Sequence, residues 1–175
     1  MTLSLDGFVA DEQGSVSRLY PDLADLRDTD YMRALIEQTG AVIMGRRSFE
    51  MGDPDSYVGE YEFQVPIFVL THRPPEVIPK QDENLTFTFV TEGVESAVSQ
   101  AKVAAGDRAV RVIGGANVIQ QLLGAGLVDE LQIDFMPVLL GGGLRFFASD
   151  GARPQLEVID AQQIVPRISL LFRVL

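Results

Sequence analysis

Three short stretches of the chain join an apolar run to groups that bind anions. "VIMGRRSFE" (42–50) continues into a glycine, two arginines and a serine, and "LTHRP" (70–74) carries a hydroxyl, the only histidine and an arginine. "VIGGAN" (112–117) places a glycine pair before an apolar segment of helical spacing. Guanidinium groups, hydroxyls and uncovered backbone N–H groups all donate hydrogen bonds to phosphate. The three stretches therefore predict a site for a small ligand that carries phosphate.

Each stretch also has a purely structural interpretation. Arg46 and Arg47 could bridge surface carboxylates, because exposed ion pairs are common. His72 could be an exposed loop residue, and we predict no metal site because the chain has neither a cysteine nor a second histidine. Gly114 and Gly115 could serve a tight turn for steric reasons alone. Both interpretations stay open at this point.

Two carboxylates are candidates for catalysis. Asp134 alternates with Leu131, Ile133 and Phe135 on a segment expected to be a buried strand, so it needs a polar partner or a function. A structural hydrogen bond is the alternative for Asp134, and Asp6 is the weaker catalytic candidate. The remaining acids near the N-terminus are expected on the solvated face of a helix: Asp22, Asp25, Asp28 and Asp30.

Alternating strands and helices are predicted to position these groups. Apolar runs predict buried strands, and segments of helical periodicity predict helices. We expect strands at 41–45, 65–70, 85–90 and 109–115, and helices at 22–39, 46–51, 92–105 and 116–126. This alternation is typical of an α/β fold whose parallel strands present their carboxyl ends at one edge. A single domain over residues 1–175 is the expected organisation.

The two ends of the chain give further expectations. Leu3 and Leu5 alternate with polar neighbours, which is typical of a half-buried strand, and Gly40 is expected to cap the first helix. From residue 128 onward, strand-like segments follow one another without a helix, which indicates antiparallel strands at the edge of the sheet. The run Gly141–Gly143 is interpreted as a flexible turn.

The composition excludes several classes of function. With 25 acidic and 14 basic residues the formal net charge is -11, which disfavours a nucleic-acid surface or an anionic membrane as partner. The absence of cysteine excludes disulfides and a thiol nucleophile. The first residues lack the pattern of a secretory signal, and no apolar run is long enough to span a membrane, so we expect cytoplasmic residence.

Five segments taken in order resemble a known fold family. "SLDGFVA", "VIMGRRSFE", "FVLTHRP", "VIGGANVIQQLL" and "VDELQIDFMPVLLGGG" resemble the dihydrofolate reductase superfold. They are most similar to its branch that contains the C-terminal reductase domain of the riboflavin-biosynthesis deaminase-reductase and small stand-alone relatives. The resemblance implies a three-layer sandwich with a mostly parallel central sheet of about eight strands, an antiparallel C-terminal edge and helices on both faces. It also implies NADPH lying across the strand ends.

The resemblance assigns the cofactor residues in four groups. Gly45, Arg46, Arg47 and Ser48 match the segment that holds cofactor phosphates, and Thr71, His72 and Arg73 match the segment around the adenosine 2'-phosphate. Gly114, Gly115, Ala116, Asn117 and Val118 match the segment beside the pyrophosphate. The backbone of Thr2 and Val9 falls where the family contacts the nicotinamide amide. The substrate side departs from the family. The folate-binding carboxylate of the family falls at Thr29, which argues against dihydrofolate as the substrate.

The leading hypothesis is an NADPH-dependent reductase of a small heterocyclic substrate, pterin-like or ribosylaminopyrimidine-like, or of a carbonyl compound. The alternative is a non-catalytic NADP(H)-binding or dimeric scaffold protein of the same fold. A riboflavin-pathway reductase in the strict sense would need a site for the substrate phosphate, to which Arg145 and Arg18 could contribute. The apolar C-terminal segment "ISLLFRVL" predicts a homodimer.

Overall fold

The computed structural model describes residues 1–147 and 151–175 and divides the chain into two compact units. Arg27–Gln121 form one unit, named here the central unit. Met1–Leu26 and Leu122–Leu175 form the other, named here the terminal unit. A single domain over residues 1–175 stays a prediction.

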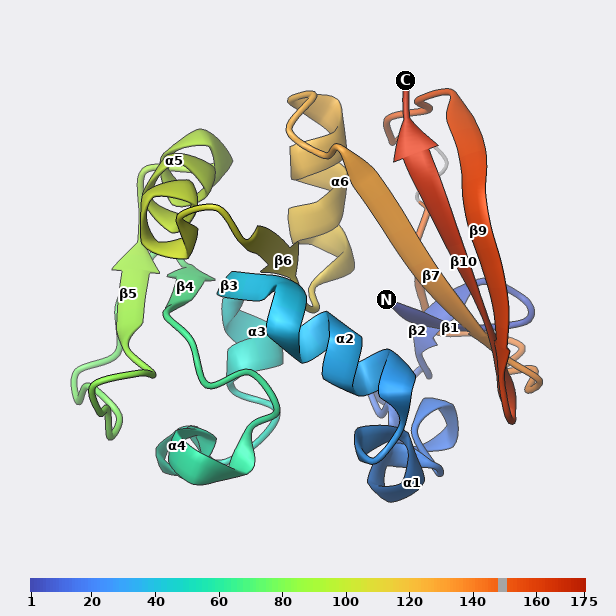
Figure 1. Ribbon diagram of the computed structural model, residues 1–175, viewed down its shortest axis with the longest axis horizontal. Coiled ribbons are helices and arrows are strands. Elements are labelled where there is room, and N and C mark those ends of the chain that lie inside the picture. Colours follow the sequence, from blue (N-terminus) through green and yellow to red (C-terminus); the bar gives the residue numbers. More distant parts are fainter. Residues whose placement is uncertain (148–150) are drawn as a thin grey trace. The chain divides into compact units, whose positions relative to one another are not determined.

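The central unit is built on a four-stranded parallel sheet with the order β5-β4-β3-β6 (Figure 1). Its elements are α2 (Asp30–Gln38), β3 (Thr39–Gly45), α3 (Arg46–Phe49), η2 (Pro54–Ser56), α4 (Tyr57–Glu60), β4 (Ile67–Leu70), β5 (Phe87–Val90), α5 (Val94–Ala105), β6 (Ala109–Val112) and the start of α6 (Ala116–Gly124). All seven residues of β3 are buried, as expected for an inner strand with both faces covered. Because all four strands are parallel, their carboxyl ends meet at one edge.

Helix α5 packs closely against this sheet, and Gly40 makes that packing possible. A Cβ added at Gly40 would lie 2.6 Å from the carbonyl oxygen of Ala105, closer than real Cβ contacts occur. The prediction that Gly40 caps the first helix is wrong, since Thr39 holds the C-cap position of α2. Gly40 belongs to β3, where only the absence of a side chain lets the end of α5 approach.

The terminal unit contains a mixed sheet with the order β1-β7-β10-β9 and a short pair formed by β2 and β8 (Figure 1). Its elements are β1 (Thr2–Ser4), β2 (Phe8–Ala10), η1 (Ser17–Leu19), α1 (Leu23–Arg27, at the boundary), β7 (Glu130–Met136), β8 (Leu144–Arg145), β9 (Leu156–Ile164) and β10 (Arg167–Val174). Strand β1 runs parallel to β7, whereas β10 runs antiparallel to both β7 and β9. The predicted antiparallel C-terminal strands are therefore present.

The α/β fold class is confirmed, but the expected count of about eight strands in one sheet is not. The described strands hydrogen-bond in groups of four, two and four, with a parallel and a mixed sheet among them. Within the described part of the chain, no helix combines the length and apolar character needed to cross a membrane.

Two predictions about the N-terminal region are wrong in detail. The helix expected over 22–39 is broken before Thr29, whose Oγ1 accepts a hydrogen bond from the Met32 N–H at 3.1 Å and caps α2. The first strand is not half-buried. Thr2, Leu3 and Ser4 are all buried, whereas Leu5 lies beyond the strand and is 65% exposed. The alternation ends there because the chain turns at Gly7, which has a positive φ of 86°.

Candidate functional site

The carboxyl edge of the parallel sheet gathers the three predicted phosphate-binding stretches. Arg46–Ser48 follow β3, Thr71–Arg73 follow β4, and Gly114–Gly115 follow β6. Since β4 and β6 are the two neighbours of β3, the three segments lie side by side at one edge of one sheet. The predicted meeting of these strand ends at one edge is thus present within the central unit.

Arg46 links the ends of β3 and β4. Its Nε donates to Oε1 of Glu50 at 2.7 Å, and its Nη1 donates to the carbonyl oxygen of Arg73 at 2.9 Å. The hydroxyl of Thr71 donates to the same carbonyl at 2.8 Å and accepts from the Arg73 N–H at 3.2 Å. These hydrogen bonds hold the turn after β4 in place. Arg46 also forms the ion pair with a surface carboxylate that its structural interpretation predicts.

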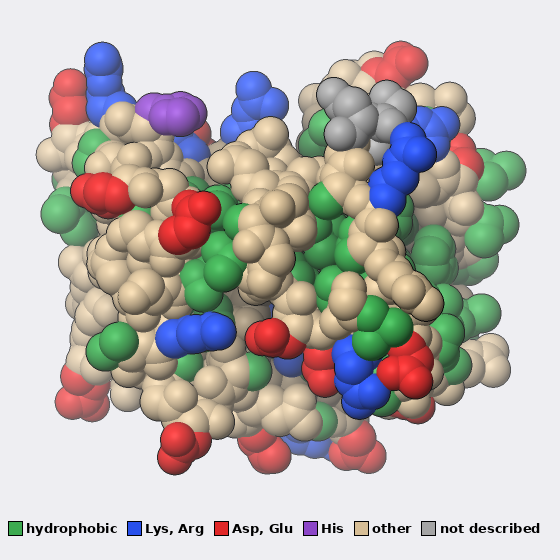
Figure 2. Space-filling model, turned by 90° about the horizontal axis from the view of Figure 1, so that it is seen from above, with side chains coloured by type: hydrophobic (Ala, Val, Ile, Leu, Met, Phe, Trp, Pro, Cys, Tyr) green, Lys and Arg blue, Asp and Glu red, His purple; other side chains and the backbone are tan. Residues whose placement is uncertain are grey.

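The other two guanidinium groups at this edge are available to a ligand. Arg47 and Arg73 are exposed, and neither side chain forms an ion pair with residues 1–147 or 151–175. A small pocket opens between the two strand ends, lined by Arg46, Glu50, Thr71, Arg73, Pro75 and Phe89 among others. His72 is exposed, and Figure 2 shows the single histidine (purple) at the surface with basic side chains (blue) near it.

Beside the arginines, glycines leave the backbone uncovered. Gly114 and Gly115 both have φ of 84°, a conformation that residues with a side chain rarely adopt. A Cβ at Gly114 would lie 2.6 Å from Oγ of Ser48, and a Cβ at Gly45 would lie 3.1 Å from Cγ2 of Val118. The side chain of Ser48 thus occupies the space that a side chain at Gly114 would need, and Val118 narrows the space at Gly45. Bare backbone at these positions suits a ligand phosphate that contacts backbone N–H groups.

Helix α6 starts directly after this glycine pair. Ala116 and Val118 are buried and anchor its first turn, whereas Asn117 is exposed and its Oδ1 accepts from Nε2 of Gln121 at 2.6 Å. The role of these residues in pyrophosphate binding stays a prediction.

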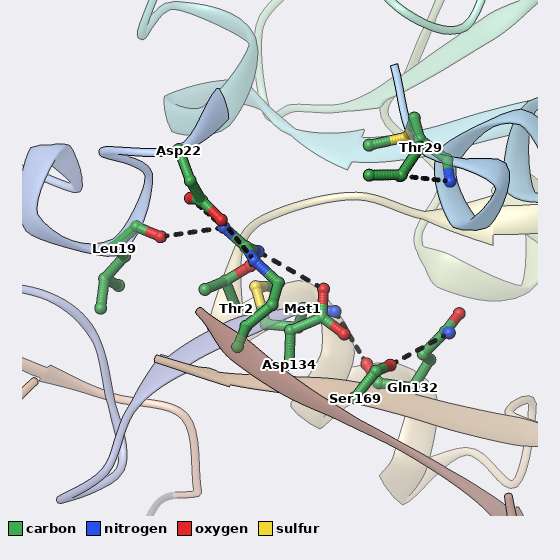
Figure 3. Close-up of polar contacts among 10 residues, drawn as sticks. Met1, Thr2, Leu19, Asp22, Thr29, Gln132, Asp134 and Ser169 are labelled. Atoms are coloured by element: carbon green, nitrogen blue, oxygen red, sulfur yellow. Dashed lines mark hydrogen bonds and ion pairs between the residues drawn. The ribbon is translucent and has the colours of Figure 1, made fainter. Parts of the chain in front are cut away.

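In the terminal unit, the sequence reasoning missed Arg167, the largest fully buried side chain. Its guanidinium donates to Asp22 from Nε at 3.0 Å and from Nη2 at 2.5 Å. It also donates to Oγ1 of Thr2 at 3.0 Å and to the Leu19 carbonyl at 3.4 Å, and it lies 3.5 Å from Oδ2 of Asp134. Figure 3 shows these groups converging on one point. A guanidinium has five N–H groups, so the oxygen partners match its hydrogen-bonding capacity.

The cluster keeps Arg167 charged although it is buried. Burial by itself lowers the pKa of the guanidinium, but the hydrogen bond and charge of Asp22, with the charge of Asp134, outweigh burial and raise the pKa above its ordinary value. The ring of Tyr20 lies 5.7 Å below the guanidinium carbon, and burial raises the pKa of this phenol. Tyr20 is therefore neutral at physiological pH.

The prediction for the surroundings of Asp134 is confirmed, whereas the prediction for Asp22 is wrong. Asp134 is buried on β7, as predicted, and an ion pair at 3.5 Å with Arg167 gives it a structural partner. Its catalytic role stays a prediction. The expectation that Asp22 lies on a solvated helix face is wrong, because its side chain is only 11% exposed and pairs with Arg167. The available signal was Arg167 itself, a cation alternating with Ser169 in an apolar strand, which requires buried acids.

Asp6 fixes the loop that leads to β8. Its carboxylate accepts from the backbone N–H groups of Leu140 at 3.1 Å and Gly141 at 2.7 Å. The hydroxyl of Ser4 and these two N–H groups lower the pKa of Asp6 to about 2. A catalytic role of Asp6 stays a prediction beside this structural one.

The glycine run Gly141–Gly143, whose first member donates to Asp6, is more constrained than the predicted flexible turn. Gly143 has a φ of 124°, and a Cβ there would lie 2.1 Å from the carbonyl oxygen of Ala10 in β2. Gly143 is therefore required by the close approach of the chain to β2.

The residues expected near the nicotinamide are both buried. Thr2 lies in β1 and Val9 in β2, so both belong to the terminal unit, unlike the rest of the predicted cofactor residues. Arg145, considered for a substrate phosphate, lies 4.4 Å above the ring of Phe8. The functions of these three residues stay predictions.

The sequence matches one protein family and two proteins of Bacillus subtilis. Residues 1–170 match the family described as RibD C-terminal domain. Two uncharacterized proteins of Bacillus subtilis strain 168 are related: YyaP is 24% identical over 173 residues (93% of this chain, 85% of YyaP), and YwjB is 28% identical over 149 residues (84% and 79%).

Solved structures show the same fold. A protein from Shewanella sp. PV-4, provisionally assigned to riboflavin biosynthesis, superposes with a TM-score of 0.78 at 24% identity over 100% of this chain and 96% of its own. A diaminohydroxyphosphoribosylaminopyrimidine deaminase/5-amino-6-(5-phosphoribosylamino)uracil reductase from Thermotoga maritima superposes with a TM-score of 0.71 at 17% identity, over 99% of this chain and 55% of its own. The chain thus spans about half the length of that two-function enzyme.

Proposed function

Because the chain belongs to the family of RibD C-terminal domains, we propose that it is an NADPH-dependent reductase of a small heterocyclic or carbonyl substrate. The family supports a reductase-like role. The choice of NADPH and of a substrate class goes further and rests on the residues at the carboxyl edge of the parallel sheet. The riboflavin-pathway reaction named for the Thermotoga protein is one instance of this substrate class.

The single observation that carries the proposal is the concentration of cations at this edge. Three guanidinium groups, from Arg46, Arg47 and Arg73, follow two adjacent strands in a chain whose formal net charge is -11. One carboxylate at this edge, that of Glu50, is paired with Arg46. A local cationic site in an acidic protein favours a small anion over an extended polyanion.

The residues present fit the phosphate-bearing half of NADPH. The pocket between β3 and β4 offers the guanidinium groups of Arg46 and Arg73 for the adenosine 2'-phosphate, with Thr71 in the same wall. The side-chain-free backbone at Gly114 and Gly115, with the hydroxyl of Ser48 beside it, supplies backbone N–H groups that could donate to the pyrophosphate. When bound, the cofactor supplies hydride from nicotinamide C4, while the chain contributes binding and orientation.

Replacing the two guanidinium groups that lack ion pairs tests this assignment. We expect Arg47→Ala and Arg73→Ala each to weaken NADPH binding by about tenfold, because a charge-assisted hydrogen bond to phosphate is lost. Both side chains are exposed, so the free energy of unfolding should change by no more than about 0.5 kcal/mol. Unchanged affinity in both variants would overturn the assignment.

One observation favours the alternative, a non-catalytic NADP(H)-binding protein. The buried acids of the terminal unit, Asp22 and Asp134, are both paired with Arg167 rather than left facing solvent. An assay of NADPH consumption distinguishes the reductase from the non-catalytic protein. It follows absorbance in the presence of pterins, flavin precursors and quinones. Oxidation of one NADPH per substrate reduced supports the reductase, whereas tight NADPH binding without turnover across the panel supports the alternative.

A further inference from the structure

An acidic side chain lines the pocket that the proposed function assigns to a phosphate. Glu50 follows α3, one helical turn after Arg46, and shares the pocket wall with Thr71 and Arg73. The ion pair between Arg46 and Glu50 is half-exposed, with 45% and 47% of the two side chains accessible. A carboxylate at this place repels a phosphate dianion, so its presence affects how the pocket works.

Glu50 engages Arg46 where a phosphate would bind. An arginine grips phosphate through two parallel N–H groups, and one such pair comprises the Nε–H and an Nη–H. In this structure the Nε–H of Arg46 donates to Glu50 at 2.7 Å, and Nη1 donates to the Arg73 carbonyl at 2.9 Å. Arg46 is therefore partly occupied before any ligand arrives, whereas Arg47 and Arg73 form no ion pair with the described residues.

Glu50 has two opposite effects on a bound phosphate: it orients Arg46, and it repels the phosphate. As an orienting partner, an exposed ion pair one helical turn apart changes an equilibrium by about twofold. As a repelling charge about 7 Å from a phosphate dianion, it weakens binding by roughly sevenfold in water without salt and by about twofold at physiological ionic strength. Removing Glu50 also frees the Nε–H of Arg46. Without salt, repulsion alone exceeds the benefit of orientation. At physiological ionic strength the two are of similar size, and the freed Nε–H of Arg46 adds to the gain on removing Glu50.

Given the proposed NADPH-dependent function, we propose that Glu50 is a specificity-determining residue that competes with the adenosine 2'-phosphate for Arg46. Glu50 holds Arg46 in the free protein and is exchanged for the phosphate when the cofactor binds. It thereby limits the affinity for NADPH but not for NADH, which lacks the 2'-phosphate. This competition weakens as salt screens the charges.

The test compares Glu50→Gln with Glu83→Gln as a matched control. Glu83 is exposed and precedes β5, so it lies toward the opposite, amino-terminal edge of the parallel sheet. Each variant and the unmodified protein are titrated with NADPH and NADH by cofactor fluorescence, at low and at physiological salt. A second pair of probes, adenosine 2'-phosphate and adenosine, is titrated by NMR and requires neither the nicotinamide nor a reaction.

We expect Glu50→Gln to bind NADPH and adenosine 2'-phosphate about two- to sevenfold more tightly, most strongly at low salt. Binding of NADH and adenosine should not change, and Glu83→Gln should match the unmodified protein. Equal or weaker binding of adenosine 2'-phosphate by Glu50→Gln overturns the inference.

The two proposals can fail separately. If the unmodified protein prefers NADPH but Glu50→Gln changes nothing, the inference fails and the proposed function stands. If Glu50→Gln tightens adenosine 2'-phosphate while no variant binds NADPH, the competition of Glu50 with the phosphate for Arg46 stands and the proposed NADPH-dependent function fails. If none of the four probes binds to any variant, both fail.

Discussion

The buried cluster around Arg167 makes a quantitative prediction about stability. Arg167→Met keeps the length of the side chain but removes the guanidinium, which is fully buried. It leaves the carboxylates of Asp22 and Asp134, 11% and 10% exposed, without their cation. Breaking a buried ion pair by removing one partner costs about 3–5 kcal/mol, a large part of the roughly 5–15 kcal/mol that holds a typical domain folded.

Arg173→Met is the matched control, because it removes an arginine from the same strand. Arg173 pairs with Glu157 at 2.7 Å, but both side chains are 55% exposed. An exposed pair contributes about 0–1 kcal/mol, so this variant should unfold almost as the unmodified protein does. Arg167→Lys should lie between the two variants, since an ammonium has three donors in place of five.

Urea denaturation followed by circular dichroism gives the free energy of unfolding of the three variants and the unmodified protein. We expect Arg167→Met to lose at least about 2 kcal/mol more than Arg173→Met, a margin set by the lower bound for buried pairs and the upper bound for exposed pairs. Equal losses in the two variants would refute the view that Arg167 holds the terminal unit together through its acids.

Two other regions give further predictions. The pKa of Asp6 is lowered to about 2 in the folded protein from an ordinary value of 3.8, so its contribution to stability is present above about pH 4 and is lost as the pH falls toward 2. When stability is measured against pH, Asp6→Asn should not show this loss of stability. A profile identical to that of the unmodified protein would contradict the stabilising role of the Asp6 carboxylate. The predicted homodimer would use the sheet face that carries Val158 and Ile168, which are 61% and 51% exposed. Val158→Asp with Ile168→Asp should shift light scattering from dimer to monomer, whereas a monomeric unmodified protein would remove the prediction.

The parallel sheet and its carboxyl edge could be predicted from the sequence because they depend on local patterns. Each apolar run is short and ends at a glycine or polar group, as at Gly45 and Thr71. Once the strands are parallel, those ends must share an edge, so adjacency follows without knowledge of any side-chain contact. This is why Arg46 and Arg73 could be placed near each other.

The cluster in the terminal unit could not be predicted in the same way. Arg167 and Asp22 are 145 residues apart, and their meeting depends on how the segment between η1 and α1 packs against β10, which the sequence does not reveal. Local signals were also outweighed at Leu3 and Leu5, where the alternation is genuine but a turn ends the strand before Leu5. The helix break at Thr29 had a readable signal, because threonine followed by an acid is a common helix start.

The most direct test of the central claim is a titration of the unmodified protein with NADPH and, under identical conditions, with NADH. The account predicts markedly tighter binding of NADPH, with a preference that decreases as salt is added, because the proposed site for the adenosine 2'-phosphate carries Arg46 and Arg73, with Arg47 at the same edge of the sheet. Equal affinity for the two cofactors, or binding of neither, would contradict the assignment of this cationic edge to NADPH.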